Sequence, residues 1–125
     1  MKKRLTKEES ANLISLGVPK EKANWRVIGI DVDVNMPLER LIEESQVEPY
    51  FTLDSILEIL PKAVHKEGLA YDYNLEMLWQ EDMKGWLTTY DAIGDNAGSV
   101  FEIELIDSLY RLLCQTIENG YLKFE

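Results

Sequence analysis

The sequence predicts an α+β domain in which a long C-terminal helix packs on a small antiparallel sheet. Two patterns support this prediction. Residues 69–80 alternate between apolar and polar side chains, which indicates a strand with one buried face. Residues 99–120 repeat apolar side chains every three or four positions, between a helix-start and a helix-stop signal. We therefore expect a hairpin of strands 69–80 and 85–91, a further strand at 25–34, a helix at 100–119 and two or three short helices.

Three short helices have recognisable start signals. Thr6 and Glu9 form a capping box, in which each side chain accepts a hydrogen bond from the other residue's backbone N–H. Pro37 suits the first turn of a second helix, LERLIEES, because its φ angle is already helical. Thr52 is a suitable N-cap for a third helix, LDSILEIL, which Pro61 ends.

The strand predictions depend on β-branched residues and on alternation. Residues 25–34, WRVIGIDVDV, place isoleucine and valine on one face and become acidic on the other. The hairpin turn EDMKG joins the second predicted strand to the third. A symmetric hairpin makes three cross-strand pairs on one face, namely Trp79 with Trp86, Met77 with Thr88, and Leu75 with Tyr90.

The long helix is expected to begin at Ser99, with Glu102 completing a capping box, and to end at Gly120. Its wide apolar stripe needs an apolar surface to cover. The best candidate is the aromatic face of the hairpin, which carries Tyr71, Tyr73, Trp79, Trp86 and Tyr90. We interpret these rings as core in preference to a ligand platform. If the Trp79–Trp86 end extends past the helix, the exposed aromatic patch indicates a protein-binding site.

Length and charge limit the classes of function. A chain of 125 residues is about one domain, so we expect residues 1–125 to form a single one. Its net charge of −10 disfavours direct binding to DNA or RNA, because such binding depends largely on Lys and Arg contacts to phosphates. No apolar run resembles a signal peptide or a membrane span, and the single cysteine excludes an internal disulfide. We expect a cytoplasmic protein.

Residues that carry chemistry are few and scattered. Asp31, Asp33 and Asn35 match the start of a calcium-binding loop, but Met36 stands where the loop needs glycine and Ile42 where it needs glutamate. The only histidine, His65, lies in a charged loop without a nearby catalytic partner, and Cys114 lies at the margin of an apolar helix face. We therefore predict no catalytic, cofactor-binding or metal-binding residue, and not an enzyme.

Two segments, Phe51–Lys62 and Glu104–Tyr121, together with the opening residues 5–10 and 16–18, carry a family resemblance. The chain resembles a set of small uncharacterised proteins that recur in gut bacteria and in their phages or prophages. Because that set has no assigned activity, the resemblance implies an accessory setting in a mobile element and transfers no functional residue.

The first hypothesis is a non-enzymatic interaction or accessory protein of the phage or mobile-element type that contacts an unknown protein partner or forms a homo-oligomer. The expected contact residues are the acidic positions and the hairpin tryptophans, namely Glu39, Glu43, Glu44, Glu48, Trp79 and Trp86. An alternative is an anionic decoy that mimics DNA and occupies a nucleic-acid-binding protein. A weaker alternative is a small-ligand or metal-binding module at Asp31 and Asp33.

Overall fold

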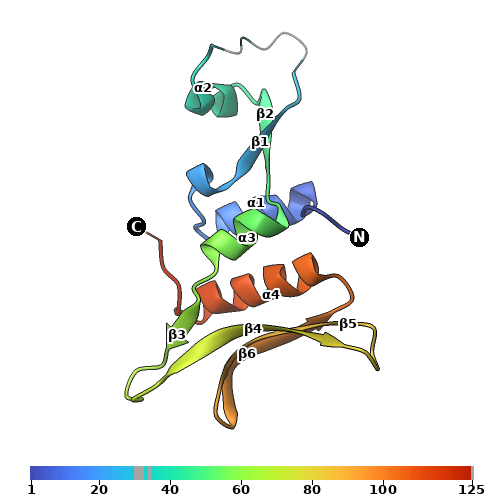
Figure 1. The fold of residues 1–125 in the computed structure, drawn as a ribbon. Coiled ribbons are helices and arrows are strands. Elements are labelled where there is room, and N and C mark those ends of the chain that lie inside the picture. Colours follow the sequence, from blue (N-terminus) through green and yellow to red (C-terminus); the bar gives the residue numbers. More distant parts are fainter. Residues whose placement is uncertain (30–32, 34, 125) are drawn as a thin grey trace.

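A curled four-stranded antiparallel sheet and the helix that follows it form the body of the molecule (Figure 1). We analysed a computed structural model that describes residues 1–29, 33 and 35–124, and its fold is α+β as predicted. The strands lie in the order β3–β4–β5–β6, and their bounds are Ala63–His65, Asp72–Gln80, Gly85–Ala92 and Asp95–Glu102. Helix α4, Leu105–Glu118, lies across one face of this sheet (Figure 1).

Helix α4 covers the face that carries the aromatic side chains of the hairpin, as predicted. Tyr73, Thr88 and Tyr90 share this face and are completely buried. Thr88 Oγ1 lies 2.7 Å from Ser108 Oγ of α4, so the two elements are joined by a buried hydrogen bond. The hydroxyl of Tyr90 donates to the carbonyl of Pro61 at 2.7 Å, which gives this large polar side chain a buried partner.

Two shorter helices pack on the side of α4 that faces away from the sheet (Figure 1). They are α1, Lys7–Ser15, and α3, Leu53–Ile59. Leu13 of α1, Ile56 of α3 and the neighbouring Phe51 have no exposed surface, so they extend the core beyond the sheet. The core therefore lies on both sides of α4, which explains why its apolar stripe is so wide.

A small arm projects from the body at the end opposite the sheet (Figure 1). The arm contains strand β1, Asn24–Val27, helix α2, Leu38–Glu43, and strand β2, Val47–Tyr50, and the short 3-10 helix η1, Lys20–Lys22, leads into it. Strands β1 and β2 pair antiparallel as a separate two-stranded sheet.

The hairpin is confirmed down to its register. Trp79 pairs with Trp86, Met77 with Thr88, and Leu75 with Tyr90, as the alternation predicts. The predicted caps at Thr6 and Thr52 are also present. Thr6 Oγ1 accepts from the backbone N–H of Glu9 at 3.1 Å, and Thr52 Oγ1 accepts from that of Ser55 at 3.2 Å. Local patterns therefore identified these elements correctly.

The start of the long helix was predicted wrongly. Ser99 is not its N-cap but a residue of strand β6, and α4 begins at Leu105 with Glu104 as an N-cap that makes no side-chain hydrogen bond. Residues 99–102 pair instead with Thr89–Trp86 of β5. Val and Phe suit a strand as well as a helix, so the neighbouring strand decided between the two.

The predicted strand at 25–34 was correct only in part. The structure has β1 at Asn24–Val27, and its partner is β2 of the arm, not the hairpin. Ile30, Asp31, Val32 and Val34 lie outside the described residues. Strands β2, β3 and β6 were not predicted. Strands β2 and β3 have only four and three residues and show too little alternation, and Gly94 and Gly98 made the start of β6 resemble a loop.

Candidate functional site

The two hairpin tryptophans, exposed Trp79 and half-buried Trp86, form an aromatic pair at the end of the sheet. Trp79 of β4 and Trp86 of β5 lie directly opposite each other, with ring centroids 5.5 Å apart and planes at 66°. The indole N–H of Trp79 donates to Glu81 at 2.7 Å, and Glu81 also pairs with Lys84. These hydrogen bonds, with that from Lys84 the stronger, hold the pKa of Glu81 below its usual value. The ring of Trp79 is therefore held in place although it is 47% exposed.

The aromatic face is covered only in part, and the uncovered end is the one with the tryptophans. Tyr73 and Tyr90 are core, whereas Trp86 is half-buried, and Met77, Trp79 and Tyr71 remain exposed by 41%, 47% and 48%. Helix α4 packs on β5 and β6, so the outer half of β4 receives little cover from it. The core interpretation is therefore confirmed for two of the five rings.

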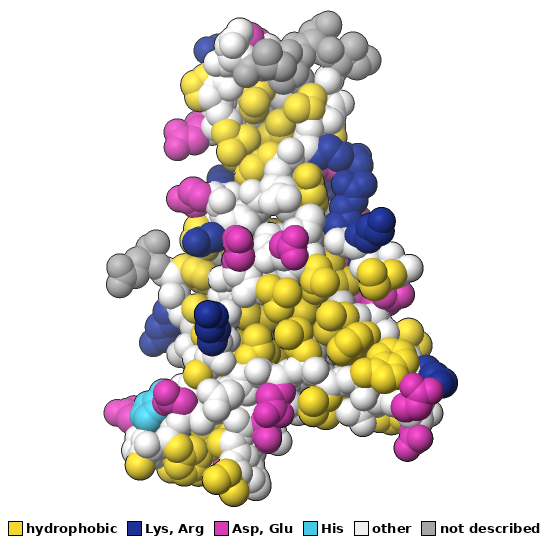
Figure 2. All heavy atoms as spheres, viewed as in Figure 1, with side chains coloured by type: hydrophobic (Ala, Val, Ile, Leu, Met, Phe, Trp, Pro, Cys, Tyr) yellow, Lys and Arg dark blue, Asp and Glu magenta, His cyan; other side chains and the backbone are white. Residues whose placement is uncertain are grey.

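A cleft of about 310 Å³ adjoins Trp86. Its apolar walls are Leu53 at the start of α3, and Leu105 and Ile106 at the start of α4, while Lys3 and Asp54 contribute charge. Figure 2 shows apolar side chains gathered on this face of the molecule, over the helices and the hairpin. We define the tryptophan surface by its residues: Leu53, Trp86 and Leu105, which line the cleft, Trp79, which contacts Trp86, and Met77, which lies two residues before Trp79 on β4.

The N-terminal segment that borders this cleft is fixed by Lys2. Its ammonium group lies 2.8 Å from a Glu9 oxygen and 2.6 Å from an Asp107 oxygen, which joins α1 to α4. Partial burial lowers the pKa of Lys2, but the hydrogen bonds to Asp107 and Glu9 outweigh burial and raise it overall. Lys2 therefore has a structural partner on each side, and Lys3 beside it remains exposed to solvent.

The predicted acidic contact residues lie in the arm, far from the tryptophans (Figure 1). Glu39 and Glu43 are exposed on α2, but Glu44 pairs with Arg40 at 3.1 Å. The Glu48 side chain is only 18% exposed and pairs with Arg26 at 3.0 Å and Lys7 at 3.7 Å. The structure therefore separates the predicted contact residues into two places, and two of the four glutamates already have a cationic partner.

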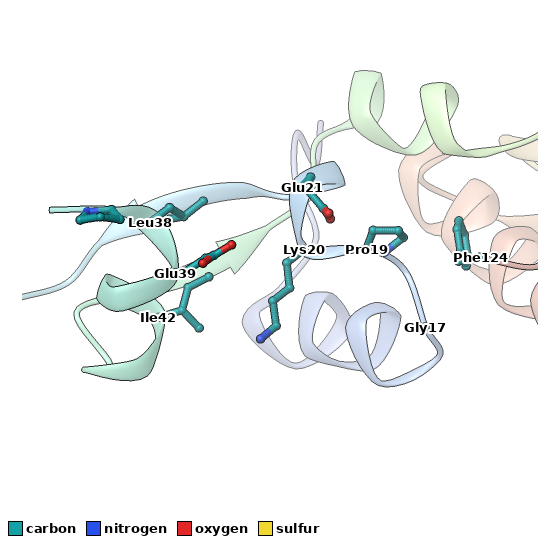
Figure 3. A pocket seen from close by; sticks show the side chains of 9 residues that line it. Gly17, Pro19, Lys20, Glu21, Leu38, Glu39, Ile42 and Phe124 are labelled. Atoms are coloured by element: carbon teal, nitrogen blue, oxygen red, sulfur yellow. The ribbon is translucent and has the colours of Figure 1, made fainter. Parts of the chain in front are cut away.

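A hollow of about 940 Å³ lies between the arm and the body (Figure 3). Leu38, Glu39 and Ile42 of α2 line one side of it, and Pro19 and Lys20 line the other, with Phe124 farther along. Its walls are mainly apolar side chains, with three charged groups and no histidine or cysteine. We find no arrangement there that favours a chemical reaction.

The side chains that could act in catalysis or metal binding do not lie together in one site. His65 Nδ1 lies 2.8 Å from Asp72 Oδ1 across β3 and β4, but both side chains are more than half exposed. Burial raises the pKa of the Cys114 thiol. Among residues 1–29, 33 and 35–124, no three His, Cys, Asp or Glu side chains are grouped to hold a metal. Asp31 lies outside the described residues, so the Asp31–Asp33 hypothesis stays a prediction.

One polar cluster was missed at the turn between β5 and β6. The Tyr73 hydroxyl donates to Asp95 at 2.5 Å, and the Lys66 ammonium lies 3.6 Å from Asp95 and 4.9 Å from the centre of the Tyr73 ring. The hydrogen bond to Asp95, followed by burial, raises the pKa of Tyr73. Because Tyr73 has no exposed surface, we interpret this cluster as a support for the β5–β6 turn.

Leu78, which is 42% exposed on the other face of β4, was not predicted as a contact residue. Leu78 is the large apolar residue among the otherwise mostly polar even positions of residues 69–80, and that exception was the available signal.

Comparison with known proteins identifies no relative. No protein-family model matches the chain, and searches of curated proteins and of solved structures returned no match. No helix within the described part of the chain has the length and apolar character to cross a bilayer.

Proposed function

We propose that this chain is a non-enzymatic interaction protein that binds another protein through the tryptophan surface. The observation that carries the proposal is the exposed, edge-to-face pair of Trp79 and Trp86 beside an apolar cleft. Tryptophan and methionine are enriched in the buried centres of protein interfaces, where large apolar side chains contribute most of the binding free energy.

The surface also has the fixed geometry that favours binding. Trp79 is hydrogen-bonded to Glu81, and the T-shaped contact with Trp86 restricts both rings. A partner that covers these side chains therefore loses less conformational entropy than it would on a flexible surface. The resemblance to phage and prophage proteins supports an accessory setting, in which binding to a protein of the host or of the phage is the activity.

The experiment places the photo-crosslinking residue benzoyl-phenylalanine at position 79 and, as a control, at position 93. Ile93 is fully exposed in the turn between β5 and β6, away from the tryptophan surface. We expect a protein from the organism that encodes the chain to form adducts at position 79 and not at position 93. That protein is then purified and titrated against the unmodified chain by calorimetry.

The matched variants are Trp79→Ser and Tyr71→Ser. Tyr71 directly precedes β4 and Trp79 lies within it, and the two rings are exposed to a similar extent, 48% and 47%. We expect Trp79→Ser to weaken binding by about tenfold or more, because truncation of an aromatic hot-spot residue costs about 2 kcal/mol or more. Tyr71→Ser should leave affinity unchanged. Equal losses in the two variants, or equal adducts at positions 79 and 93, would contradict the proposal.

A further inference from the structure

The outer half of strand β4 is an uncovered sheet edge. Strand β3 pairs only with Asp72, Tyr73 and Asn74, and one further hydrogen bond joins the N–H of Leu75 to the carbonyl of Lys62 at 2.9 Å. Beyond Leu75, no other strand in the described part of the chain pairs with this side of β4. Five residues, Glu76 to Gln80, therefore form a free edge.

The unpaired backbone groups on this edge belong to Met77 and Trp79. In an antiparallel ladder, alternate residues direct both their N–H and C=O groups to the same neighbour. Leu75 directs its N–H toward the side of β3, so Met77 and Trp79 direct theirs to that side as well. By the same alternation, Glu76, Leu78 and Gln80 direct their backbone groups to β5. The edge thus offers two donors and two acceptors.

Glu76 is the one charged side chain on this edge, which otherwise lacks the usual devices that prevent pairing with another chain. Such devices are proline, lysine, a bulge or a covering loop. Residues 76–80 contain neither proline nor lysine, and the register irregularity of the sheet lies between β5 and β6. Three consecutive apolar side chains, Met77, Leu78 and Trp79, are each more than 40% exposed. Such an edge either aggregates or is paired in the functional state.

We propose that the edge pairs with the β4 edge of a second copy of this chain, so that two four-stranded sheets become one continuous sheet. This inference rests on the proposed function, because it names the partner of the tryptophan surface. The two β4 strands run antiparallel about a two-fold axis at Leu78. Met77 of each copy then exchanges two hydrogen bonds with Trp79 of the other.

The side chains favour this register. It places Leu78 opposite Leu78, and Met77 opposite Trp79, which is a favourable thioether–aromatic pair. Glu76 is opposite Gln80, so no two carboxylates face each other. A shift of two residues one way would bring Glu76 opposite Asp82 of the second copy. The opposite shift would place Trp79 of the second copy opposite Leu75, whose N–H already donates to the carbonyl of Lys62.

Charge and helix position are also compatible with a second copy. Lys62 directly precedes β3 and lies where the paired part of the β4 edge meets the free part. It makes no ion pair within the described residues. In the proposed register, pairing ends at Gln80 of the second copy, because Lys62 already occupies the position beside Leu75. The acidic turn residues Glu81 and Asp82 that follow Gln80 then lie next to Lys62. Helix α4 contacts β5 and β6, so it leaves β4 accessible from that face.

The first test measures the mass of the full chain by sedimentation velocity over a wide concentration range. We expect the mass to rise from 14.5 kDa to twice that value as concentration increases. Leu78→Lys should weaken the dimer by about tenfold or more, because two ammonium groups would meet at the axis. Met77→Pro removes an outward N–H and should have the same effect, whereas Met77→Leu keeps the N–H and should dimerise normally. Far-ultraviolet circular dichroism confirms that each variant is folded.

The second test forms a disulfide across the axis. Opposed residues at a non-hydrogen-bonded antiparallel position have Cα atoms about 4.5 Å apart, which is within the range for a disulfide. In a Cys114→Ser background, we expect Leu78→Cys to oxidise rapidly to a covalent dimer and Ile93→Cys to oxidise slowly. A chain that stays monomeric, or equal oxidation rates at the two positions, would overturn the β4 pairing.

The two proposals fail in different ways. If the chain stays monomeric but position 79 crosslinks to another protein, the proposed function stands and the second copy is the wrong partner. If a dimer forms but Leu78→Lys does not weaken it, the dimer uses another surface and the inference is overturned. If neither a dimer nor an adduct at position 79 is found, both proposals are wrong.

Discussion

The hydroxyl oxygens of Thr88 and Ser108 lie 2.7 Å apart in the interior, where they join the sheet to the helix that covers it. Ser108 has one hydrogen to donate, and the carbonyl of Val100 lies 2.9 Å from its oxygen. Thr88 therefore donates to Ser108, and Ser108 donates to the backbone of β6. Both side chains are completely buried, so neither is available as a nucleophile.

We predict that Ser108→Ala destabilises the fold by about 1–3 kcal/mol, because the Thr88 hydroxyl is left buried without a partner. Thr88→Val should cost less, since Ser108 keeps a carbonyl acceptor. The double variant should be more stable than the sum of the two single changes predicts, because it contains no orphaned hydroxyl. Urea denaturation measures the three free energies of unfolding. Additive costs would contradict the proposed donor order.

Stability should fall in acid partly through Glu9. Partial burial raises the pKa of Glu9, but hydrogen bonds from Lys2 and from Thr6 outweigh burial and lower it below 4.5. A carboxyl with a lowered folded-state pKa contributes stability above its unfolded pKa and loses it as the pH falls through the folded value. We expect Glu9→Gln to keep the capping box but to flatten the stability profile below about pH 4.5.

The control for this prediction is Glu8→Gln. Glu8 is the neighbouring residue of α1, it is exposed, and no ion pair of it is observed in the described structure. Its profile should match that of the unmodified chain. Thermal melts at several pH values compare the three proteins, and equal slopes for Glu9→Gln and the unmodified chain would contradict the assignment.

Gly85 should not accept a side chain. A Cβ atom there would lie 2.5 Å from a ring carbon of Phe101 and 2.8 Å from the carbonyl oxygen of Glu102. We expect Gly85→Ala to destabilise the fold by about 1–3 kcal/mol through overpacking of the β5–β6 pair. Gly68→Asn is the control, because that site is open and asparagine tolerates its positive φ. Thermal unfolding should show a clear loss for the first variant and little change for the second.

Cys114 should react slowly with thiol reagents. Burial raises the pKa of its thiol, and the thiolate is the reactive form. At neutral pH we expect the folded chain to react with a disulfide reagent more slowly than a free cysteine does, and the urea-unfolded chain to react at the ordinary rate. A folded chain that reacts faster than free cysteine would reopen the nucleophile interpretation.

Charge reversal in the arm tests the DNA-mimic alternative. Glu39 and Glu43 are exposed on α2, away from the tryptophan surface (Figure 1). We expect Glu39→Lys with Glu43→Lys to leave binding at the tryptophan surface unchanged when it is measured by calorimetry. Loss of a captured partner in this variant, with Trp79→Ser retaining it, would favour the acidic decoy instead. Glu48 is unsuitable for this test because its ion pairs with Arg26 and Lys7 make it part of the structure.

The candidate surface was predictable only in part. Trp79 and Trp86 were identified because alternation and turn length together determine which residues oppose each other in a hairpin. The four glutamates were identified from charge density alone, and sequence gives no information on which carboxylates meet an arginine. The free edge of β4 was not predictable, because it depends on where β3 stops.

Local rules determined the hairpin register, the caps at Thr6 and Thr52, and the apolar stripe of the last helix. These features depend on interactions between residues that are close in the chain, so periodicity and capping chemistry were sufficient to identify them. Tertiary structure alone decided that residues 95–102 pair with β5, that Trp25 belongs to a separate arm, and that the tryptophan end of the sheet stays uncovered. Each of these outcomes depends on contacts between distant segments, and local propensity is too weak to choose among them.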